Sequence, residues 1–510
     1  MEVELKLLLA SRDASALRRH RLLKEYATAL PHEQTLSDTY FDTPDLRLRH
    51  CDAGLRVRKV GDIWVQTMKG GASVHGRLHS RQEWSARLPG PGPDLAALRD
   101  VVEQKSAWGR LLRSPVVEDQ LMPIFTTHVT RIVWALRLPQ GDEVECVLDQ
   151  GKLECDGRKV PISEVELELK SGDPAHLFDF ALALQQDIPV QIGNFSKADR
   201  GYALFAPQAP AAVKASALKL SRRMSVEQAF QAIAVNCMAQ IQSNESGVAQ
   251  TQDAESVHQM RVGLRRLRSA LGLFKDVLQA PELLRRELDW LTAELGAARD
   301  WDVLAASTLP RVGREAPDEP LLAELELAAQ GVAHQKHEAA ARAVSSARHT
   351  RLVLSLTRWV HGCGWRDCLS LQDQTRLTAK VSPFARKMLL LHQRRLLKRG
   401  GQLQGASPEA RHRIRIAAKK TRYATEFFES LYCARTVRPY VAALSALQDE
   451  FGWLNDAAVA GHLLQQLQHE RTDLAGSAGF VRGCLRSGMN SDDRKIHKLW
   501  NHFKQVKLPR

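Results

Sequence analysis

The 510-residue sequence has no long apolar run, few cysteines and few aromatic residues. A membrane helix needs about 18–20 consecutive apolar residues, and no segment approaches that length, so we expect no membrane-spanning protein. The N-terminus Met1–Lys6 carries acids where a secretory leader carries bases, and the apolar run at 7–10 is short, so we expect no leader either. A composition of 44% hydrophobic and 25% charged residues indicates a globular protein.

The cysteines predict neither a disulfide framework nor a structural zinc site. Eight of them are spread over 510 residues, and no two have CxxC spacing. The sequence therefore predicts reduced thiols in a cytoplasmic protein. The eight are Cys51, Cys146, Cys155, Cys237, Cys363, Cys368, Cys433 and Cys484.

The excess of positive charge lies in the second part of the chain. The net charge is +14, yet residues 1–200 hold 27 basic and 29 acidic residues, and the remainder hold 45 and 29. A basic region of this kind favours polyanions such as nucleic acid, polyphosphate or an acidic membrane surface.

The chain changes character near residue 204. At about 100–200 residues per domain, its length predicts more than one domain. Alternating polar and apolar residues predict strands, and helices are expected at Leu95–Leu112 and Pro174–Gln186. We place a β-rich domain at 1–203, a linker at 204–223 and a helical domain at 224–505. The predicted strands are Glu2–Leu9, Gly54–Lys59, Trp64–Lys69, His79–Trp84, Thr126–Arg137, Glu143–Leu148, Lys152–Cys155 and Glu164–Lys170.

The helical domain contains an internal repeat. The segment His258–Val262 matches His412–Ile416 at an offset of 154, and further matches follow at an offset of 156. The repeat predicts two tandem helical bundles, at about 224–378 and 379–505. The downstream pairs are Gly296 with Gly452, Asp300 with Asp456 and Val303 with Val459.

Several predicted strands carry charges on one face only. In a strand, residues i and i+2 share a face, so Glu2, Glu4 and Lys6 lie opposite Val3 and Leu5. Such stripes could face water, or they could face one another inside a closed barrel. The other stripes are Arg56 with Arg58, Arg81 with Glu83, Glu143 with Glu145 and Asp149, and Glu164 with Glu166, Glu168 and Lys170.

The mixture of signs allows two interpretations. Acids and bases side by side can neutralise one another, and for Arg81, Glu143, Glu145 and Lys170 a structural salt bridge is at least as good an explanation. Together they can also bind a metal–polyanion complex, because carboxylates hold Mg²⁺ or Mn²⁺ while Arg and Lys hold phosphate oxygens. No GxxxxGK[ST] loop and no nucleophile–His–acid arrangement is present, so we expect no covalent nucleophile.

These segments resemble the CYTH, or triphosphate tunnel metalloenzyme, superfamily. The N-terminal Glu2-Val3-Glu4-Leu5-Lys6 is similar to its ExExK signature, and the resemblance covers about 1–203 in the same motif order. The other matching segments are Thr39–Thr43, Leu55–Arg58, Gln66–Lys69, Glu83-Trp84, Leu148–Gly151, Val165–Leu169 and Ser196–Tyr202.

The resemblance implies an eight-stranded antiparallel tunnel that binds a triphosphate and a divalent metal, Mg²⁺ or Mn²⁺. It assigns the catalytic roles to Glu2, Glu4, Lys6, Glu166 and Glu168. The implied metal-binding acids are Glu2, Glu4, Asp149, Glu166 and Glu168. The implied phosphate-binding bases are Lys6, Arg56, Arg58, Lys69, Arg81, Arg131 and Lys197.

The helical domain carries a basic face in each repeat. Residues spaced 3, 4 and 3 apart share one face of a helix, and stacked like charges favour an anionic partner. The alternative is a solvated face that pairs with acids of a neighbouring helix. The two faces are His258, Arg261, Arg265 and Arg268, and His412, Arg415, Lys419 and Arg422.

The same segments resemble the CHAD domain, over about 224–505. Leu295–Asp300 and Leu447–Asp456 match further recurring segments of that domain, although Arg299 differs from its counterpart Asn455. The resemblance implies an all-helical domain in which the two basic faces bind inorganic polyphosphate. Nucleic acid is the competing partner, but aromatic residues are only 6% of the chain and few are available for base stacking.

The two resemblances predict an inorganic triphosphatase that yields diphosphate and phosphate, joined to a polyphosphate-binding domain. Two alternatives stay open: a nucleotide or thiamine triphosphatase or adenylate cyclase, and a polyphosphate-binding scaffold without turnover. The pattern does not indicate an oligomeric state.

Overall fold

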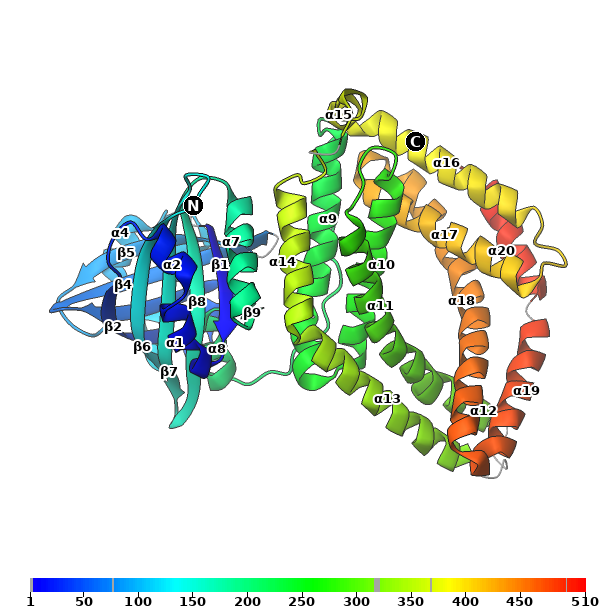
Figure 1. The fold of residues 1–510 in the computed structure, drawn as a ribbon, viewed down its shortest axis with the longest axis horizontal. Helices are drawn as coiled ribbons and strands as arrows, with labels where there is room; N and C mark the ends of the chain where they lie inside the picture. Colours follow the sequence, from blue (N-terminus) through cyan, green and yellow to red (C-terminus); the bar gives the residue numbers. More distant parts are fainter. Residues whose placement is uncertain (1–2, 76–77, 316–321, 367–368, 492) are drawn as a thin grey trace. The chain divides into compact units, whose positions relative to one another are not determined.

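The computed structural model describes residues 3–75, 78–315, 322–366, 369–491 and 493–510 (Figure 1). Its internal contacts divide the chain into two units. The first comprises Met1–Ala209 and Ser346–Gly364, and the second comprises Pro210–Ser345 and Trp365–Arg510. The first unit is a β-sheet with flanking helices and the second is helical, which confirms the predicted fold class.

The described strands of the first unit form one antiparallel sheet of nine strands. The strand order is β5-β4-β3-β2-β6-β7-β8-β1-β9, and β5 also pairs with β1 through Glu4 and His79. Eight strands therefore close into a barrel, and the short β9 adds to the end of β1 as a ninth strand that was not expected. The strands are β1 (Val3–Leu9), β2 (His32–Asp42), β3 (Ala53–Val60), β4 (Ile63–His75), β5 (Leu78–Leu88), β6 (Met122–Arg137), β7 (Glu143–Cys155), β8 (Arg158–Ser171) and β9 (Val190–Ile192).

The alternation along the strands places apolar side chains outside the barrel and charged side chains inside it. On β1, Leu5 and Leu7 are completely buried in an outer core, whereas Glu4 and Lys6 line the interior. Helices cover the apolar outer face, and Leu177 and Phe178 of helix α7 (Pro174–Asp187) belong to the same core. The charged stripes thus face one another rather than the solvent.

Several short helices of the first unit are held by side-chain caps. Asp94 caps α4 through the backbone N–H groups of Ala96 and Ala97, and Ser106 caps α5. Because of this second cap, the single helix expected at Leu95–Leu112 is two helices. The helices are α1 (Ala14–Arg18), α2 (Arg21–Tyr26), α3 (Arg47–His50), α4 (Leu95–Val101), α5 (Ala107–Leu111), α6 (Pro115–Gln120), α7 (Pro174–Asp187) and α8 (Lys197–Phe205).

Helix α14 (Ala347–His361) belongs to the first unit although it lies within the first predicted repeat in the sequence. It packs against α7: Leu354 is completely buried in the core that contains Phe178, and the His361 ring stacks on the Phe178 ring. Arg358 forms an ion pair with Asp179, and Gln185 donates a hydrogen bond to the carbonyl of Ala347. The core of the β-rich unit therefore includes a segment from the middle of the chain.

The described helices of the second unit pack around several cores, of which two are the following. One core joins α11, α13, α18 and α19, and the other joins α16, α17, α18 and α20. No helix in the described part of the chain combines the length and apolar character that a membrane crossing requires. The helices are α9 (Val226–Ser243), α10 (Ala254–Phe274), α11 (Glu282–Val303), α12 (Leu309–Glu315), α13 (Leu322–Val344), α15 (Leu371–Thr378), α16 (Val381–Gly400), α17 (Pro408–Phe428), α18 (Ala434–Glu470), α19 (Ala475–Ser491) and α20 (Asp493–Gln505).

We expect Leu354→Ala to weaken the first unit specifically. Removing a fully buried leucine leaves a cavity and costs about 2–5 kcal/mol of unfolding free energy. Hydrogen exchange of the full chain should then show loss of amide protection in α7 and β9. The control is Leu327→Ala on α13, whose side chain is 67% exposed. Unchanged protection of α7 would contradict a structural role for α14.

Candidate functional site

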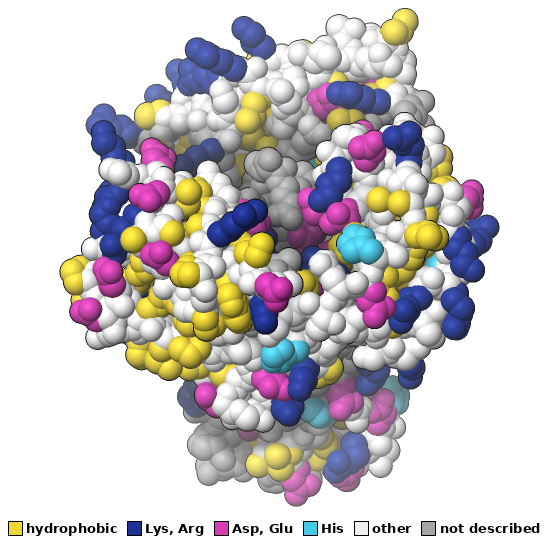
Figure 2. Space-filling model, turned by 90° about the vertical axis from the view of Figure 1, so that its left-hand side faces the viewer, with side chains coloured by type: hydrophobic (Ala, Val, Ile, Leu, Met, Phe, Trp, Pro, Cys, Tyr) yellow, Lys and Arg dark blue, Asp and Glu magenta, His cyan; other side chains and the backbone are white. Residues whose placement is uncertain are grey.

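The barrel encloses a cavity of about 270 Å³ that is lined mainly by charged side chains. Among the described lining residues, seven are basic and seven acidic, so the wall offers no excess of either sign. Figure 2 shows basic and acidic side chains around a hollow in the face that it presents. The bases are Lys6, Arg49, Arg56, Arg58, Lys69, Arg131 and Lys197, and the acids are Glu4, Asp38, Asp52, Glu83, Glu145, Glu166 and Glu168.

Asp38 on β2 organises two of the predicted phosphate-binding bases. Its carboxylate accepts hydrogen bonds from Arg58 Nε at 2.5 Å and Arg58 Nη2 at 2.8 Å, and from Arg56 Nη1 at 3.4 Å. Burial would raise the pKa of Asp38, but the two guanidinium groups outweigh it and lower that pKa. Asp38 is therefore a carboxylate whose contacts aim both arginines at the cavity.

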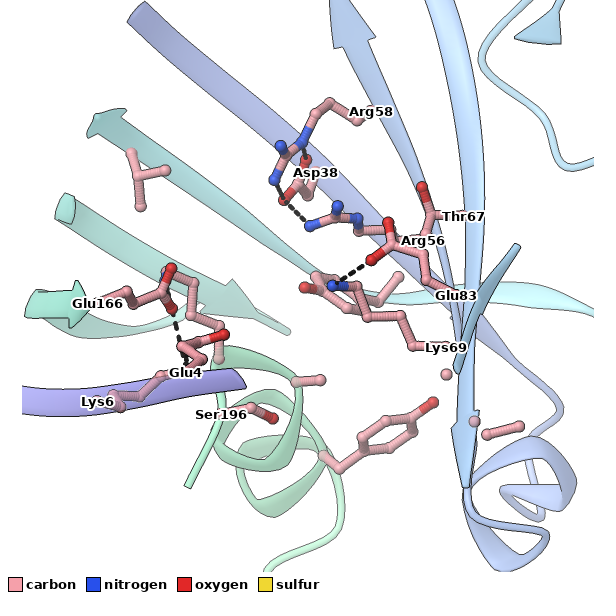
Figure 3. Close-up of a pocket in the computed structure, with 18 of the residues that line it drawn as sticks. Glu4, Lys6, Asp38, Arg56, Arg58, Thr67, Lys69, Glu83, Glu166 and Ser196 are labelled. Carbon is pink, nitrogen blue, oxygen red and sulfur yellow. Dashed lines mark hydrogen bonds and ion pairs between the residues drawn. The ribbon is translucent and has the colours of Figure 1, made fainter. Parts of the chain in front are cut away.

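Two lysines, each paired with acids, face each other across the cavity (Figure 3). Lys69 Nζ lies 2.7 Å from Glu83 Oε2 on one side. On the other side, Lys6 Nζ lies 3.0 Å from Glu166 Oε1 and 3.2 Å from Glu4 Oε1. Burial would lower the pKa of Lys6, but Glu166 and Glu4 outweigh it and raise that pKa, so Lys6 is an ammonium.

Behind this wall lies a buried cluster of carboxylates, Asp149, Glu164 and Glu166, with oxygens within 4.8 Å of one another. Arg131 makes a bidentate contact with Asp149: its Nε donates to Oδ1 at 2.8 Å and its Nη2 donates to Oδ2 at 2.7 Å. Lys197 contacts all three acids: Asp149 at 2.6 Å, Glu166 at 3.0 Å and Glu164 more closely. Arg200 Nη2 adds a bond of 2.5 Å to Glu164. Opposite charges thus saturate this cluster.

The contacts within this cluster favour the charged forms of Glu166 and Lys197. Burial would raise the pKa of Glu166, but Lys197, Lys6 and Arg131 outweigh it and hold that pKa well below its usual value. Burial would likewise lower the pKa of Lys197, yet Glu166, Glu164 and Asp149 raise it. Glu166 is therefore held as a carboxylate and Lys197 as an ammonium.

Helix α8 brings Lys197 to the cavity. Ser196 and Asp199 form a capping box, in which Ser196 Oγ accepts from the Asp199 backbone N–H and the Asp199 carboxylate accepts from the Ser196 backbone N–H. Gly201 then allows close packing, because a Cβ there would lie 2.2 Å from the Phe125 ring. The motif Ser196–Tyr202 is thus explained by how α8 is fixed to the barrel.

A row of carboxylates suits a divalent cation better than the buried cluster does. Glu4, Glu168 and Glu145 are neighbours in the register of β1, β8 and β7, and all three line the cavity. Carboxylate oxygens are the ligands that Mg²⁺ and Mn²⁺ prefer. Among the described residues, Glu168 and Glu145 are paired only with the exposed Lys170, at 2.6 and 3.7 Å, and Glu4 is paired with Lys6 at 3.2 Å. The oxygens of Asp149 and Glu164 are held more deeply, by Arg131, Lys197 and Arg200. The donor set along the cavity therefore fits a hard metal ion.

Most of the residues predicted for the tunnel meet at this cavity. Asp149 is the exception, because it lies behind the wall, bonded to Arg131 and Lys197. Glu2 and the side chain of Arg81 lie outside the described residues. Sequence reasoning missed Asp38, Arg49 and Glu164 as site residues, although Glu164 shares the strand face of Glu166. The predicted residues that line the cavity are Glu4, Lys6, Arg56, Arg58, Lys69, Arg131, Glu166, Glu168 and Lys197.

The second unit contains a separate concentration of positive charge, which we call the interhelical basic cluster. Helices α10 and α17 pack together there, so the corresponding faces of the two repeats meet. The cluster consists of His258, Arg261 and Arg265 on α10, Arg299 on α11, and Arg415 and Lys419 on α17.

Corresponding arginines of the two repeats are anchored in similar ways. Arg261 Nη1 donates to the carbonyl of Gly296 at 2.7 Å and to Asp300 Oδ1 at 3.1 Å, both on α11. Arg415 donates to Asn455 Oδ1 on α18. Each repeat therefore fixes this arginine against the following long helix.

Burial, together with neighbouring like charges, lowers the pKa values of His258, Arg261, Arg415 and Lys419 in the interhelical basic cluster. Burial and the neighbouring Arg415 and Arg265 lower the pKa of Lys419 to about 7. Burial and Arg299 likewise lower the pKa of His258. An anion bound here would relieve this repulsion.

Three predicted residues of the helical faces lie apart from this cluster or at its edge. Arg268 pairs with Asp289 at 2.7 Å, within a second cavity at the α10–α11 turn. His412 is exposed near the start of α17. Arg422 lies beside Lys419 and pairs with Glu426 at 3.4 Å.

Comparisons with known proteins identify both halves of the chain. Residues 1–202 match the CYTH domain and residues 232–465 match the CHAD domain. An inorganic triphosphatase from Haemophilus influenzae is 33% identical over 213 residues, which are 41% of this chain and 56% of that protein. The chain thus spans little more than half the length of that curated relative. The crystal structure of the CHAD domain from the plant Ricinus communis is 40% identical, with a TM-score of 0.54, and the match covers 59% of this chain and 99% of that one.

We expect Glu164→Gln to loosen α8. The substitution removes the buried negative charge that faces Lys197 and Arg200, and hydrogen bonds to charged groups contribute about 1.5–3 kcal/mol each. Calorimetry should show a lower melting temperature, and hydrogen exchange should localise the change to α8. In the control Glu143→Gln, the pair with Arg137 is half-exposed and should contribute less than about 1 kcal/mol. Equal effects of the two changes would contradict an anchoring role for Glu164.

Proposed function

This chain belongs to the CYTH and CHAD domain families, and we propose that its barrel hydrolyses inorganic triphosphate to diphosphate and phosphate. The observation that carries the proposal is the cavity inside the barrel, in which seven bases and seven acids of the described residues meet. The bases would bind the phosphate oxygens of triphosphate, and the acids would bind the metal ion that accompanies it. The triphosphatase activity named for the Haemophilus relative supports the same reaction.

The size and lining of the cavity favour an inorganic substrate over a nucleotide. Sites for drug-sized molecules have volumes of about 300–1,000 Å³, and this cavity has about 270 Å³. Tyr40 and Tyr202 are the aromatic residues among its described lining. The Tyr40 ring stacks on Phe125 at 4.4 Å, and the guanidinium of Arg49 lies over Tyr202. Both rings are thus already in contact with other groups.

The residues of the cavity wall would have two roles in phosphoryl transfer: some would bind the phosphate oxygens and one would orient the attacking water. The negative charge of a triphosphate repels an incoming water, and fixed cations lower that barrier by neutralising the oxygens. Lys6, Arg56, Arg58, Lys69, Arg131 and Lys197 would hold the phosphate oxygens. Glu168 would accept a hydrogen bond from the attacking water, and the proton would leave with the phosphate product.

Glu4, Glu168 and Glu145 are the acids that would hold a divalent metal ion. The other predicted metal-binding acid of β8, Glu166, is already held by Lys6, Arg131 and Lys197. Such an ion supplies positive charge next to the phosphoryl oxygens when it is bound. The predicted acid Glu2 would extend this set. The contacts of Asp149 favour a different role, the positioning of Arg131 and Lys197.

We expect Glu4→Ala to abolish most triphosphate turnover. Loss of a metal-holding carboxylate should lower phosphate release roughly 100-fold or more. The measurement is phosphate release from inorganic triphosphate with Mg²⁺ or Mn²⁺, with ATP and thiamine triphosphate in parallel. The control Glu143→Ala changes an exposed acid outside the cavity and should leave the rate unchanged.

The outcomes of this measurement separate the alternatives. Faster turnover of ATP or thiamine triphosphate than of inorganic triphosphate would favour a pocket for an organic group. Formation of cyclic AMP would identify a cyclase. Tight binding of triphosphate without any turnover would leave the scaffold as the explanation.

We also propose that the interhelical basic cluster binds inorganic polyphosphate. The meeting of two repeated basic faces supports this proposal, because like charges held together are stabilised by a polyanion. Bare phosphate fits this surface better than nucleic acid, since its charged members come without interleaved aromatic platforms for bases.

Polyphosphate binding should take up a proton at Lys419. Its pKa is about 7 in the free protein, and a bound polyanion raises it by favouring the ammonium form. Affinity should therefore fall as the pH rises above 7, by at most tenfold per pH unit for this one proton. Calorimetry at pH 8 in two buffers of different ionisation enthalpy measures the uptake. Lys419→Arg should remove it because arginine stays charged, whereas Lys398→Arg on the exposed face of α16 should not.

A further inference from the structure

Arg49 is the most exposed of the seven bases that line the cavity, and neither the strand pattern nor the family motifs assigned it a role. Its side chain is 42% exposed, compared with 30% for Lys69 and 7–19% for the others. It does not lie on a strand, because it belongs to the short helix α3 between β2 and β3. It is therefore the base that solvent, and an arriving anion, reaches most easily.

The backbone of Arg49 is held firmly although its side chain is exposed. The completely buried Asp42 accepts hydrogen bonds from the backbone N–H of Arg49 at 2.9 Å, of Leu48 at 2.9 Å and of Thr43 at 2.7 Å. Leu46 turns the chain with a φ of 56° just before α3. Asp42 thus fixes the base of the Arg49 side chain at the cavity wall.

The guanidinium of Arg49 bonds to α8 rather than to a strand. Its Nη1 lies 2.6 Å from Asp199 Oδ1, and its Cζ lies 5.2 Å from the centre of the Tyr202 ring. Asp199 is also the residue that completes the capping box of α8 through its other oxygen. Tyr202, Ser196 and Lys197 line the cavity together with Arg49.

We propose that Arg49 is a substrate-binding residue that exchanges Asp199 for phosphate oxygens when a triphosphate enters the cavity. The inference rests on the proposed function of the barrel. Asp199 then acts as a placeholder for the anion: it holds the guanidinium beside the cavity while the cavity contains no triphosphate.

The energetics of the two contacts favour the exchange. A partly exposed ion pair contributes about 0–1 kcal/mol, because water competes for both charges. A contact between arginine and phosphate is stronger than such an exposed ion pair, and it is often bidentate, with two parallel hydrogen bonds. Lys6, Arg56, Arg58, Arg131 and Lys197 are held more deeply: Lys197, for example, contacts three acids. Lys69 is less exposed than Arg49, at 30% compared with 42%. Arg49 is therefore the base that can change partner at the smallest cost.

The test compares two substitutions with opposite expected signs. Arg49→Ala should raise the KM for inorganic triphosphate about tenfold and leave kcat within about twofold. Asp199→Asn keeps a capping oxygen but releases Arg49, so it should lower the KM about two- to fivefold. In the Arg49→Ala background, Asp199→Asn should no longer lower the KM, which separates release of Arg49 from a general loss of negative charge. Arg49→Lys should restore part of the affinity.

Arg47→Ala is the matched control. Arg47 lies on the same helix, is 41% exposed and pairs with Asp45 at 2.8 Å, but it does not line the cavity. Melting temperatures of all variants verify folding. If Arg49→Ala and Asp199→Asn both raise the KM, or if Arg49→Ala matches Arg47→Ala, the pair is only structural and the inference is wrong.

Hydrogen exchange with inorganic triphosphate in EDTA tests the contact without turnover. Protection of α3 and α8 in the wild-type chain, lost from α3 in Arg49→Ala, is the expected result. Protection of the strands without α3 would overturn the role of Arg49 alone. No protection anywhere in the barrel, together with no turnover, would overturn the proposed function and this inference with it.

Discussion

The burial of charge inside a closed barrel is the constraint on which the first unit depends. Removing an ion from water costs several kcal/mol unless an opposite charge lies against it. The interior therefore carries one acid for each base in its described lining, and further acids lie behind the wall. The proposed triphosphate site therefore needs carboxylates as well as cations, because without the carboxylates the cations could not be held dehydrated and aligned before a triphosphate binds.

The two units solve the same electrostatic problem in opposite ways. In the barrel, acids outweigh burial and raise the pKa values of Lys6 and Lys197, so these bases stay charged at any physiological pH. In the interhelical basic cluster, acids are too few, and burial with like charges lowers the pKa of Lys419 to about 7. The first arrangement is rigid and suits precise positioning of a phosphoryl group. In the second, the proposed polyphosphate would complete the charge balance.

Local patterns predicted the inward-facing residues of β1, β3 and β8. The alternation with period two identified Glu4 and Lys6, Arg56 and Arg58, and Glu166 and Glu168, because it acts within a few residues. Contacts between distant segments were beyond such a pattern. The whole of β2 was missed as a strand, and Asp38 with it, because its first half is polar and exposed. Glu164 owes its burial to Lys197 and Arg200, more than 30 residues later.

Helix α14 shows the same limit at the level of domains. Its apolar spacing predicted a helix, but only the tertiary structure shows that Leu354 completes the core around Phe178. A division of the chain by composition alone assigns this helix to the basic half. Because its buried face belongs to the barrel unit while both of its ends continue into the helical unit, the chain crosses between the units three times rather than once. The linker at 204–223 is thus one of three connections between the units. A fragment that ended at this linker would lack α14, and the face of α7 that packs against Leu354 would be exposed to water.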